Sequence, residues 1–330
     1  MRWSVRLRGC ARFALMLLVV ATLDTEALAQ SFPTKPVRIV IPFPPGGGVD
    51  LLARTIAAEL GPRWGQNVLV ENRAGGNSVV GAEYVARAPA DGHTLLMTVN
   101  TTLTTNPFLL KSLPYDPARS FAPITLVAQG AMLVLAHPSV AAQDLRELVG
   151  LARRLPGSLN YASFGPGTQS QLIFESMNRR EDIRLVHVPY KGIAPAVTAT
   201  IAGETQLVVA SPGSIPGGIA NTRLRPLAIA GRARSPLFPH VPTTSELGYP
   251  YAQALVWMAI LAPAGAPSAI VDRIQRDVTA IVREPEFAAK HITGRGWEVV
   301  ASNPDQLATT IRDELAAMGE LFRAADIRPE

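Results

Sequence analysis

The sequence predicts an α/β fold of two domains, each a doubly wound sheet with flanking helices, joined by two hinge crossings. Short apolar strands alternate with helical segments through glycine- and proline-rich turns, which is typical of parallel sheets. Two longer apolar stretches, 121–136 and 255–261, can extend from one domain to the other. About 300 residues after a leader are also more than one compact core usually holds.

The two crossings predict a discontinuous first domain. The chain leaves it after residue 125 and returns at residue 242, so the expected domains are 31–125 with 242–330, and 126–241. Two crossings form a hinge, as in a clamshell that closes over a ligand.

The pattern of residues 1–29 predicts an export signal that is cleaved from the mature chain. Four arginines precede the apolar stretch 13–23, and Ala27-Leu28-Ala29 is a small-residue cleavage site. The expected location is the periplasm, with a soluble mature chain. Cys10 is the only cysteine and is lost with the leader, which excludes disulfides and thiolate metal sites.

The charge argues against a nucleic-acid partner. The chain has 31 basic and 26 acidic residues, a net charge of +5 that falls to about +3 without the leader. The basic residues are scattered, with no basic stripe interleaved with aromatic residues.

The first strand–loop–helix unit contains the strongest candidate for an anion site. A buried strand at 37–43 runs into the proline–glycine loop 44–48, and a helix begins near Asp50. Glycines let a ligand approach the main chain, and the N–H groups and dipole of a helix N-terminus favour negative charge. Gly61-Pro62 predicts the end of the helix.

The glycine triplet 46–48 fits neither the dinucleotide fingerprint nor a P-loop, because Leu51 occupies the position of the third glycine and no Gly-Lys-Ser/Thr follows. Nucleotide binding is therefore disfavoured. A tight turn without a ligand is the alternative.

The first domain continues with strands at 67–71 and 93–99 and a helix at 79–87. The polar run 100–106 follows the last of these strands, where ligands sit in doubly wound sheets. Its hydroxyls and amides either bind an oxyanion or form a solvated loop with Ser/Thr turn chemistry.

The second domain repeats the pattern. Its expected helices are 144–155, 171–177 and 194–202, and its strands are 159–163, 185–188, 206–210 and 226–230. The loop 164–170 has glycines, a capping hydroxyl at Thr168 or Ser170 and a following helix, as in the first loop. Lys191, at a strand end, is either a solvated charge or a ligand contact. Helices at 267–282, 285–293 and 304–324 and a short strand at 297–300 complete the chain.

Catalytic groups are not evident. The five histidines are scattered singly, and no metal-binding or nucleophile motif occurs. We therefore expect no enzyme activity, no metal and no cofactor.

Seven motifs occur in a familiar order: KPVRIV (35–40), PFPPGG (42–47), VENR (70–73), LPYDP (113–117), NYAS (160–163), VPYKG (188–192) and APAG (262–265). Over the whole mature chain they resemble the Bug receptors, the substrate-binding proteins of tripartite tricarboxylate transporters. The resemblance implies a type II periplasmic binding protein that closes over a small organic carboxylate, held largely by main-chain groups and ordered water.

The resemblance also implies the ligand-binding residues. Carried onto matching positions, they are Pro44, Gly46, Gly47, Asp50, Asn100, Thr101, Thr102, Asn106, Ser163, Gly165, Thr168, Tyr190, Lys191 and Gly192.

The chain departs from the family pattern in three places. The family often has a Gly-Thr-His-like step at 101–103 and a His-Leu pair at 171–172, where this chain has Thr-Thr-Leu and Gln-Leu. Ala210 stands where an acidic residue is common. An aspartate there would suit an amino or hydroxyl group, so Ala210 argues against amino-acid ligands.

Three functions compete: a monomeric receptor that delivers a carboxylate to membrane transporter subunits, a sensor that presents its ligand to a signalling protein, and a periplasmic enzyme. The missing catalytic groups argue against the third. The sequence does not separate the first two.

Overall fold

The computed structural model describes residues 32–215, 219–231, 233–253 and 255–324. The expected leader, 1–29, lies outside these residues. Among the helices in the described ranges, none combines the length and apolar character needed to cross a membrane.

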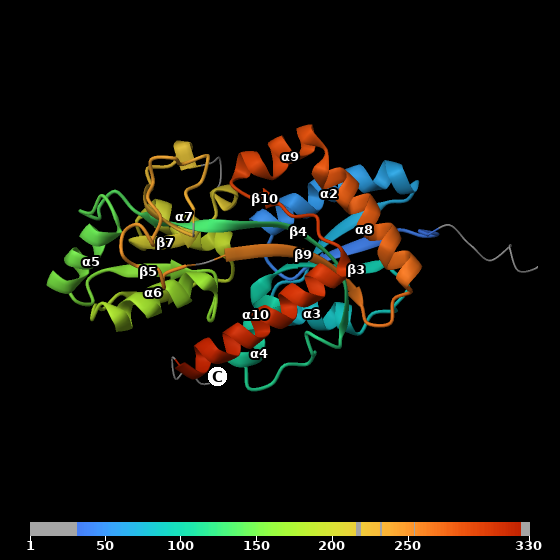
Figure 1. Ribbon diagram of the computed structural model, residues 1–330, viewed down its shortest axis with the longest axis horizontal. Helices are drawn as coiled ribbons and strands as arrows, with labels where there is room; N and C mark the ends of the chain where they lie inside the picture. The colour runs from blue at the N-terminus through green and yellow to red at the C-terminus, as the bar shows by residue number, and fades with distance from the viewer. Residues whose placement is uncertain (1–31, 216–218, 232, 254, 325–330) are drawn as a thin grey trace, which may run out of the picture.

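The strands form one ten-stranded sheet in the order β2-β1-β3-β9-β4-β7-β5-β6, and β8 and β10 also pair with β4. Figure 1 shows two groups of elements joined by β4 and β9. We call them the first lobe (β1–β3, β10, α2–α4 and α8–α10) and the second lobe (β5–β8 and α5–α7). This arrangement confirms the α/β clamshell architecture with two crossings.

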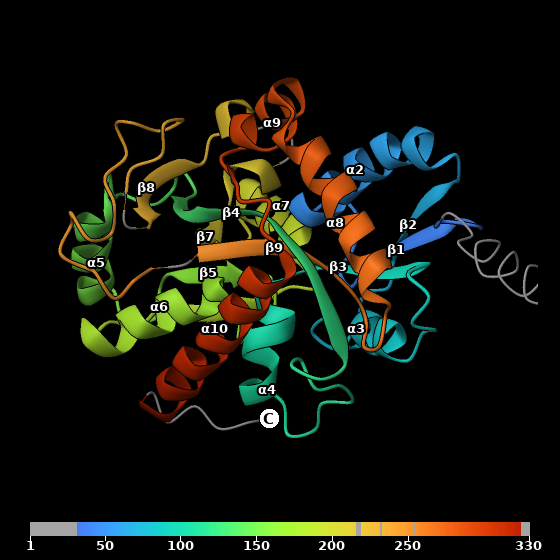
Figure 2. The same cartoon turned by 45° about the vertical axis from the view of Figure 1, so that its right-hand side comes forward.

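The first lobe is built on parallel strands. β1 (Val37–Ile41) pairs with both β2 (Val68–Asn72) and β3 (Thr94–Val99). The other elements are α2 (Gly48–Trp64), α3 (Val79–Ala86), the π-helical turn η1 (Thr101–Thr105), α4 (Asn106–Leu109), α8 (Ser268–Arg283), α9 (Pro285–His291), η4 (Thr293–Arg295), β10 (Glu298–Val299) and α10 (Pro304–Ala324). In Figures 1 and 2, α10 lies across the crossing strands and ends near α4.

The second lobe is also built on parallel strands. β5 (Asn160–Ser163) pairs in parallel with β6 (Val186–Pro189) and β7 (Leu207–Ala210). The other elements are α5 (Leu145–Arg154), α6 (Gln169–Arg180), α7 (Ile193–Ala202), η2 (Pro212–Ser214), η3 (Ile219–Asn221) and β8 (Arg225–Ala230). Asp144 caps α5 by accepting a hydrogen bond from the Glu147 N–H at 2.9 Å.

β4 (Phe121–Ala136) and β9 (Leu255–Pro263) connect the lobes. β4 pairs antiparallel with β9 over 121–131 and with β7 and β8 over its last residues. One strand is thus hydrogen-bonded into both lobes. The expected domain boundaries near 125 and 241 stay a prediction.

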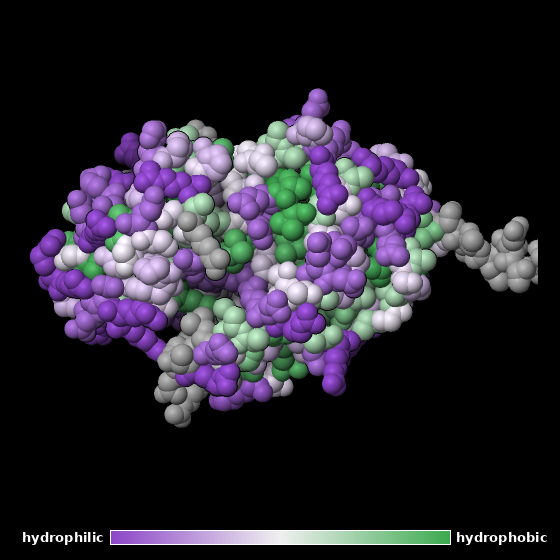
Figure 3. All heavy atoms as spheres, in the orientation of Figure 1, coloured by the Kyte–Doolittle hydropathy of each residue, from purple (hydrophilic) through white to green (hydrophobic). Residues whose placement is uncertain are grey.

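β1 is buried on both faces, as its apolar sequence predicts. Val37, Ile39 and Ile41 belong to one hydrophobic cluster, which includes the apolar face of α2, and Val40 belongs to the cluster on the other face. The C-terminal end of β1 and the start of α2 therefore have well-defined positions. Figure 3 shows that the outer surface is mostly hydrophilic in this view, with a strip of hydrophobic residues below α9.

The structure corrects the expected end of α2. The helix continues through Gly61 and Pro62 to Trp64 and is capped by Gly65 at φ 62°. The Trp64 indole donates to Asp277 at 2.7 Å, and its ring packs edge-on against Phe32. These contacts stabilise the last turn, although Pro62 has no N–H to donate to the carbonyl four residues earlier.

Candidate ligand-binding site

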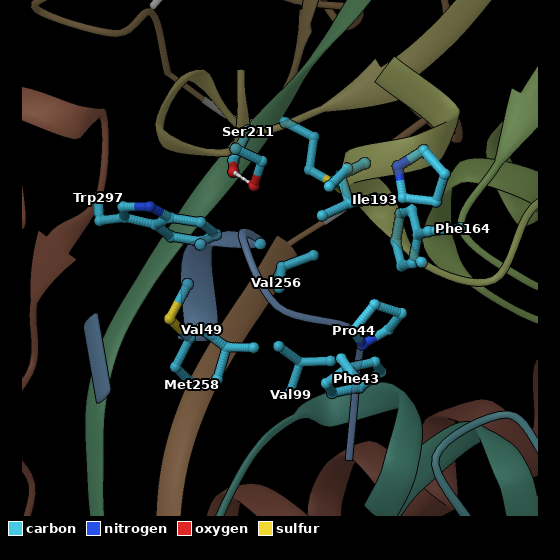
Figure 4. Close-up of a pocket in the computed structure, with 17 residues that line it drawn as sticks. Phe43, Pro44, Val49, Val99, Phe164, Ile193, Ser211, Val256, Met258 and Trp297 are labelled. Atoms are coloured by element: carbon cyan, nitrogen blue, oxygen red, sulfur yellow. Dashed lines mark hydrogen bonds between the residues drawn. The ribbon is translucent and has the colours of Figure 1, made fainter. Parts of the chain in front are cut away.

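A pocket lies where the loop after β1 meets the start of α7. The empty space between its walls is about 570 Å³, counted together with the open solvent at its mouth. Residues from both lobes and both crossing strands line it: Phe43, Pro44, Gly47, Gly48, Val49, Val99, Met132, Phe164, Gly192, Ile193, Ala194, Pro195, Ser211, Ser214, Val256, Met258 and Trp297 (Figure 4).

The N-terminus of α2 forms one wall of the pocket. Gly47 is the N-cap, in an extended conformation (φ −75°, ψ 163°), and no described side chain caps the helix. The first-turn N–H groups, beginning at Gly48, have no acceptor inside the helix. They are available to an anion in the pocket.

The N-terminus of α7 forms the facing wall. Gly192, its N-cap, has φ 120°, and within the described chain no side chain caps this helix either. The two termini are adjacent: a Cβ added to Gly47 would lie 3.3 Å from Ile193 Cγ2, and one added to Gly192 would lie 3.1 Å from Pro44 Cδ. One small anion can therefore interact with both helix ends.

Two hydroxyls add to these donors. Ser211 follows β7 directly, and its Oγ lies 2.6 Å from Ser214 Oγ. A Cβ added to Gly48 would lie 3.2 Å from Ser214 Oγ, so the serine pair borders the start of α2. In the view of Figure 4, Ser211 lies at the upper edge of the pocket and Phe43 and Val99 lie along the lower edge.

The remaining side chains in the pocket are apolar. They include three aromatic rings and two methionines: Phe43, Phe164, Trp297, Met132 and Met258. Among the lining residues that the structure describes, none has a charged side chain. The site thus combines hydrogen-bond donors with an apolar enclosure.

Of the residues expected from the sequence, Pro44, Gly47 and Gly192 line this pocket. Sequence reasoning did not place Ser211, Ser214 or Trp297 in it. Ser211 nevertheless stands directly after a buried strand. That position is the signal that could have identified it.

Asp50 is hydrogen-bonded to the proline–glycine loop and does not line the pocket. Its buried carboxylate accepts hydrogen bonds from Arg54 (3.0 Å), Asn72 (2.8 Å) and the Gly46 N–H (3.0 Å). Burial raises the pKa of Asp50, but these hydrogen bonds and the Arg54 charge lower it more, so the net shift is downward. Asp50 thus ties Gly46 to α2.

The polar run 100–106 is a buried helical turn, so of its two alternatives the solvated loop is wrong. Thr102 donates to Ser78 Oγ at 2.8 Å, and Asn106 exchanges hydrogen bonds with Asn77. Asn100 and Thr104 both donate to Glu314 of α10, at 2.8 and 3.0 Å. These polar groups are used inside the first lobe because η1 packs under α10.

Thr101 differs from its neighbours because it contacts the second lobe. Its hydroxyl donates to Gln169 Oε1 of α6 at 3.1 Å. Nearby, Asn77 Nδ2 donates to the Pro166 carbonyl at 3.0 Å. These two hydrogen bonds connect the lobes.

The loop after β5 also lies at this contact between the lobes. Ser163 Oγ donates to the Gly165 carbonyl (3.1 Å) and lies 2.6 Å from Nε2 of His187, whose pKa is lowered by burial. Thr168 Oγ1 also donates to the Gly165 carbonyl, at 2.7 Å. Gly165 has φ 138°, and a Cβ there would lie 2.8 Å from Asn77 Oδ1. Of this loop, Phe164 lines the pocket.

Tyr190 and Lys191 flank the pocket without lining it. Lys191 is exposed. Tyr190 is half-buried, and burial together with Glu204 raises the pKa of its hydroxyl.

Two lobes that share two crossing strands, with a donor-rich pocket between them, define a two-lobed solute-binding protein. Residues 52–327 match the model of the "Tripartite tricarboxylate transporter family receptor". The chain belongs to this family, as its motifs predict.

Individual proteins of similar sequence or structure are consistent with this family assignment. The chain is 31% identical to the protein BugT of Bordetella pertussis over 307 residues, which are 93% of this chain and 94% of that protein. Among solved structures, Rpa4515 of R. palustris with adipate has a TM-score of 0.87 and 30% identity, covering 91% of this chain and 100% of that one. MatC from Rhodopseudomonas palustris with bound malate has a TM-score of 0.82 and 29% identity, covering 88% and 99%.

Proposed function

We propose that this protein is a periplasmic receptor that captures a small organic carboxylate and delivers it to a tripartite tricarboxylate-type membrane transporter. The observation that carries the proposal is the meeting of two uncapped helix N-termini at one pocket. Structures of similar proteins with adipate and with malate support a carboxylate ligand.

In this proposal a carboxylate bridges the lobes. Free N–H groups at the start of α2 and α7, with the serine hydroxyls and water, donate to its oxygens. The residues expected from the sequence have different roles in this proposal. Those that contact the ligand are Pro44, Gly47 and Gly192, and those that hold the loop are Gly46 and Asp50. The others support the first lobe (Asn100, Thr102 and Asn106), lie where the lobes meet (Thr101, Ser163, Gly165 and Thr168) or flank the entrance (Tyr190 and Lys191).

The sensor hypothesis predicts the same pocket. Adjacent genes separate the two: membrane transporter subunits favour delivery, and a sensor kinase favours signalling. Catalysis has less support, because the described lining of the pocket contains serines but no histidine, carboxylate or lysine that could act as a base.

A thermal-shift screen tests the ligand class. A ligand that binds only the native state stabilises it by about 2.7 kcal/mol at a hundredfold excess over Kd. For about 300 residues that unfold together, this raises the unfolding midpoint by roughly 4 °C, and by more if the domains unfold separately. The panel contains C2–C8 mono-, di- and tricarboxylates beside neutral sugars, amino acids and polyamines, and we expect shifts with carboxylates.

Shifts with sugars or polyamines, and none with any carboxylate, would contradict the proposal. The screen is repeated with the Lys191→Ala variant. Because Lys191 is exposed, its charge is screened, and the variant should weaken carboxylate binding by no more than about fivefold.

A further inference from the structure

We propose that the pocket selects monocarboxylates with an apolar body, alkyl or aromatic, over dicarboxylates of the same length. This inference rests on the proposed function, since it concerns the same pocket.

The hydrogen-bond donors of the pocket are gathered near one point. The start of α7 lies against the proline–glycine loop, and Ser214 lies against Gly48 at the start of α2. These groups are main-chain N–H and hydroxyl donors. One carboxylate with its two oxygens can use them together, and none of the described lining residues has a cationic side chain to pair with a second carboxylate.

The rest of the enclosure suits a hydrocarbon. Phe43 and Phe164 come from the loops after β1 and β5, and Trp297 precedes β10. Val256 and Met258 of β9 and Met132 of β4 complete the wall, as Figure 4 shows in part. Aromatic rings and thioethers pack well against apolar ligands of varied shape.

A second carboxylate would therefore be buried without a partner. The described lining residues offer it no arginine, lysine or histidine. Burying an unpaired charge is costly, so a dicarboxylate must either forfeit affinity or keep its second group at the open mouth. Its monocarboxylate counterpart avoids this cost and gains apolar contact instead.

The test compares ligands that differ only in the second carboxylate. Calorimetric titrations at pH 7.5 use hexanoate against adipate, and benzoate against terephthalate. We expect each monocarboxylate to bind at least tenfold more tightly. Equal or tighter binding of the dicarboxylates overturns this inference and leaves the proposed function intact. Failure of all four acids, together with a negative carboxylate screen, overturns the proposed function itself.

Two variants of one half-buried residue give a second readout. Phe164→Ala should weaken hexanoate binding by about three- to tenfold, and Phe164→Arg should shift the preference toward adipate by supplying a cation. Phe108→Ala is the matched control, because Phe108 is a half-buried phenylalanine of α4 that packs on Phe322 outside the pocket. An unchanged hexanoate-to-adipate ratio in both folded Phe164 variants would also count against the inference.

Discussion

The carboxylate of Asp50 holds the binding loop from below. It is 2% exposed and accepts four hydrogen bonds: two from Arg54, one from Asn72 and one from the Gly46 N–H. Because these bonds join the loop to α2 and β2, the position of the free N–H groups depends on a side chain that does not line the pocket. At the residue scale, Asp50 is therefore a positioning residue.

Asp50→Asn should lower the free energy of unfolding by about 1–3 kcal/mol at pH 7, because Arg54 and the Gly46 N–H lose a charged acceptor. The pKa of Asp50 is lower in the folded protein than its usual 3.8. Its carboxylate thus contributes stability above about pH 4 and loses it as the pH falls through the native pKa. Urea unfolding at pH 7, 5 and 3 should show the difference from wild type shrinking below about pH 4.

The control for this measurement is Asp313→Asn. Asp313 is 71% exposed and lies 3.7 Å from Arg312, so the variant should change stability by less than about 1 kcal/mol at every pH. An Asp50→Asn difference that stays constant down to pH 3 would contradict the role given to Asp50.

At the element scale, the unit that carries the site is the loop 44–48 with α2. Two of its glycines serve different purposes. Gly46 has φ 91° and open space around it, whereas Gly47 has an ordinary φ but faces Ile193 of α7. Position 46 requires glycine because of its backbone conformation, whereas position 47 requires glycine because the two lobes approach each other closely there.

Gly47→Val should weaken carboxylate binding at least tenfold, because its methyl groups would meet Ile193 and cover the first-turn N–H groups. The unfolding midpoint should change by less than about 2 °C, since φ −75° is accessible to valine. Circular dichroism and calorimetric titration measure the two effects.

Gly46→Ala is the paired control and should behave in the opposite way. It forces an L side chain to φ 91° and should cost about 1–2 kcal/mol of stability, with affinity kept within about threefold. Normal affinity of folded Gly47→Val would remove this loop from the site.

At the scale of the whole molecule, binding depends on how the lobes meet. β4 and β9 connect them through the backbone, while Thr101–Gln169 and Asn77–Pro166 connect them through side chains. In the proposed function, a ligand held by both α2 and α7 stabilises the arrangement in which these contacts form, which we call the closed arrangement. Contacts between the lobes should therefore influence ligand affinity even where they do not touch the ligand.

Thr101→Val removes the hydroxyl that reaches Gln169 and keeps the side-chain shape. It should raise Kd by about two- to fivefold, mainly through faster dissociation, because the closed arrangement loses one hydrogen bond. Stopped-flow dissociation of the tightest carboxylate from the screen measures this effect.

Thr104→Val is the matched control, since the Thr104 hydroxyl bonds to Glu314 and the Asn100 carbonyl within the first lobe. It should lower stability without changing dissociation. If Thr101→Val releases ligand at the wild-type rate, the contact does not stabilise the closed arrangement.

The sequence by itself determined the order of strands and helices, the two crossings and the proline–glycine loop at a helix N-terminus. These features follow from local patterns: β1 has a continuous apolar run, α2 has apolar residues at helical spacing, and β4 is long and apolar. The motifs also determined the family. The end of α2 escaped prediction because Trp64 is held by Asp277, which is distant in the sequence.

Only the tertiary structure decided which polar groups face the pocket. Asp50, Asn100 and Thr102 have the chemistry of ligand contacts. Their partners Asn72, Glu314 and Ser78 instead use their hydrogen bonds inside the first lobe. Ser211 and Trp297 reach the pocket because the sheet and the return of the chain bring them beside α2. A polar side chain has the same local signature whether its partner is protein or ligand, and which of the two it meets depends on residues far away along the chain.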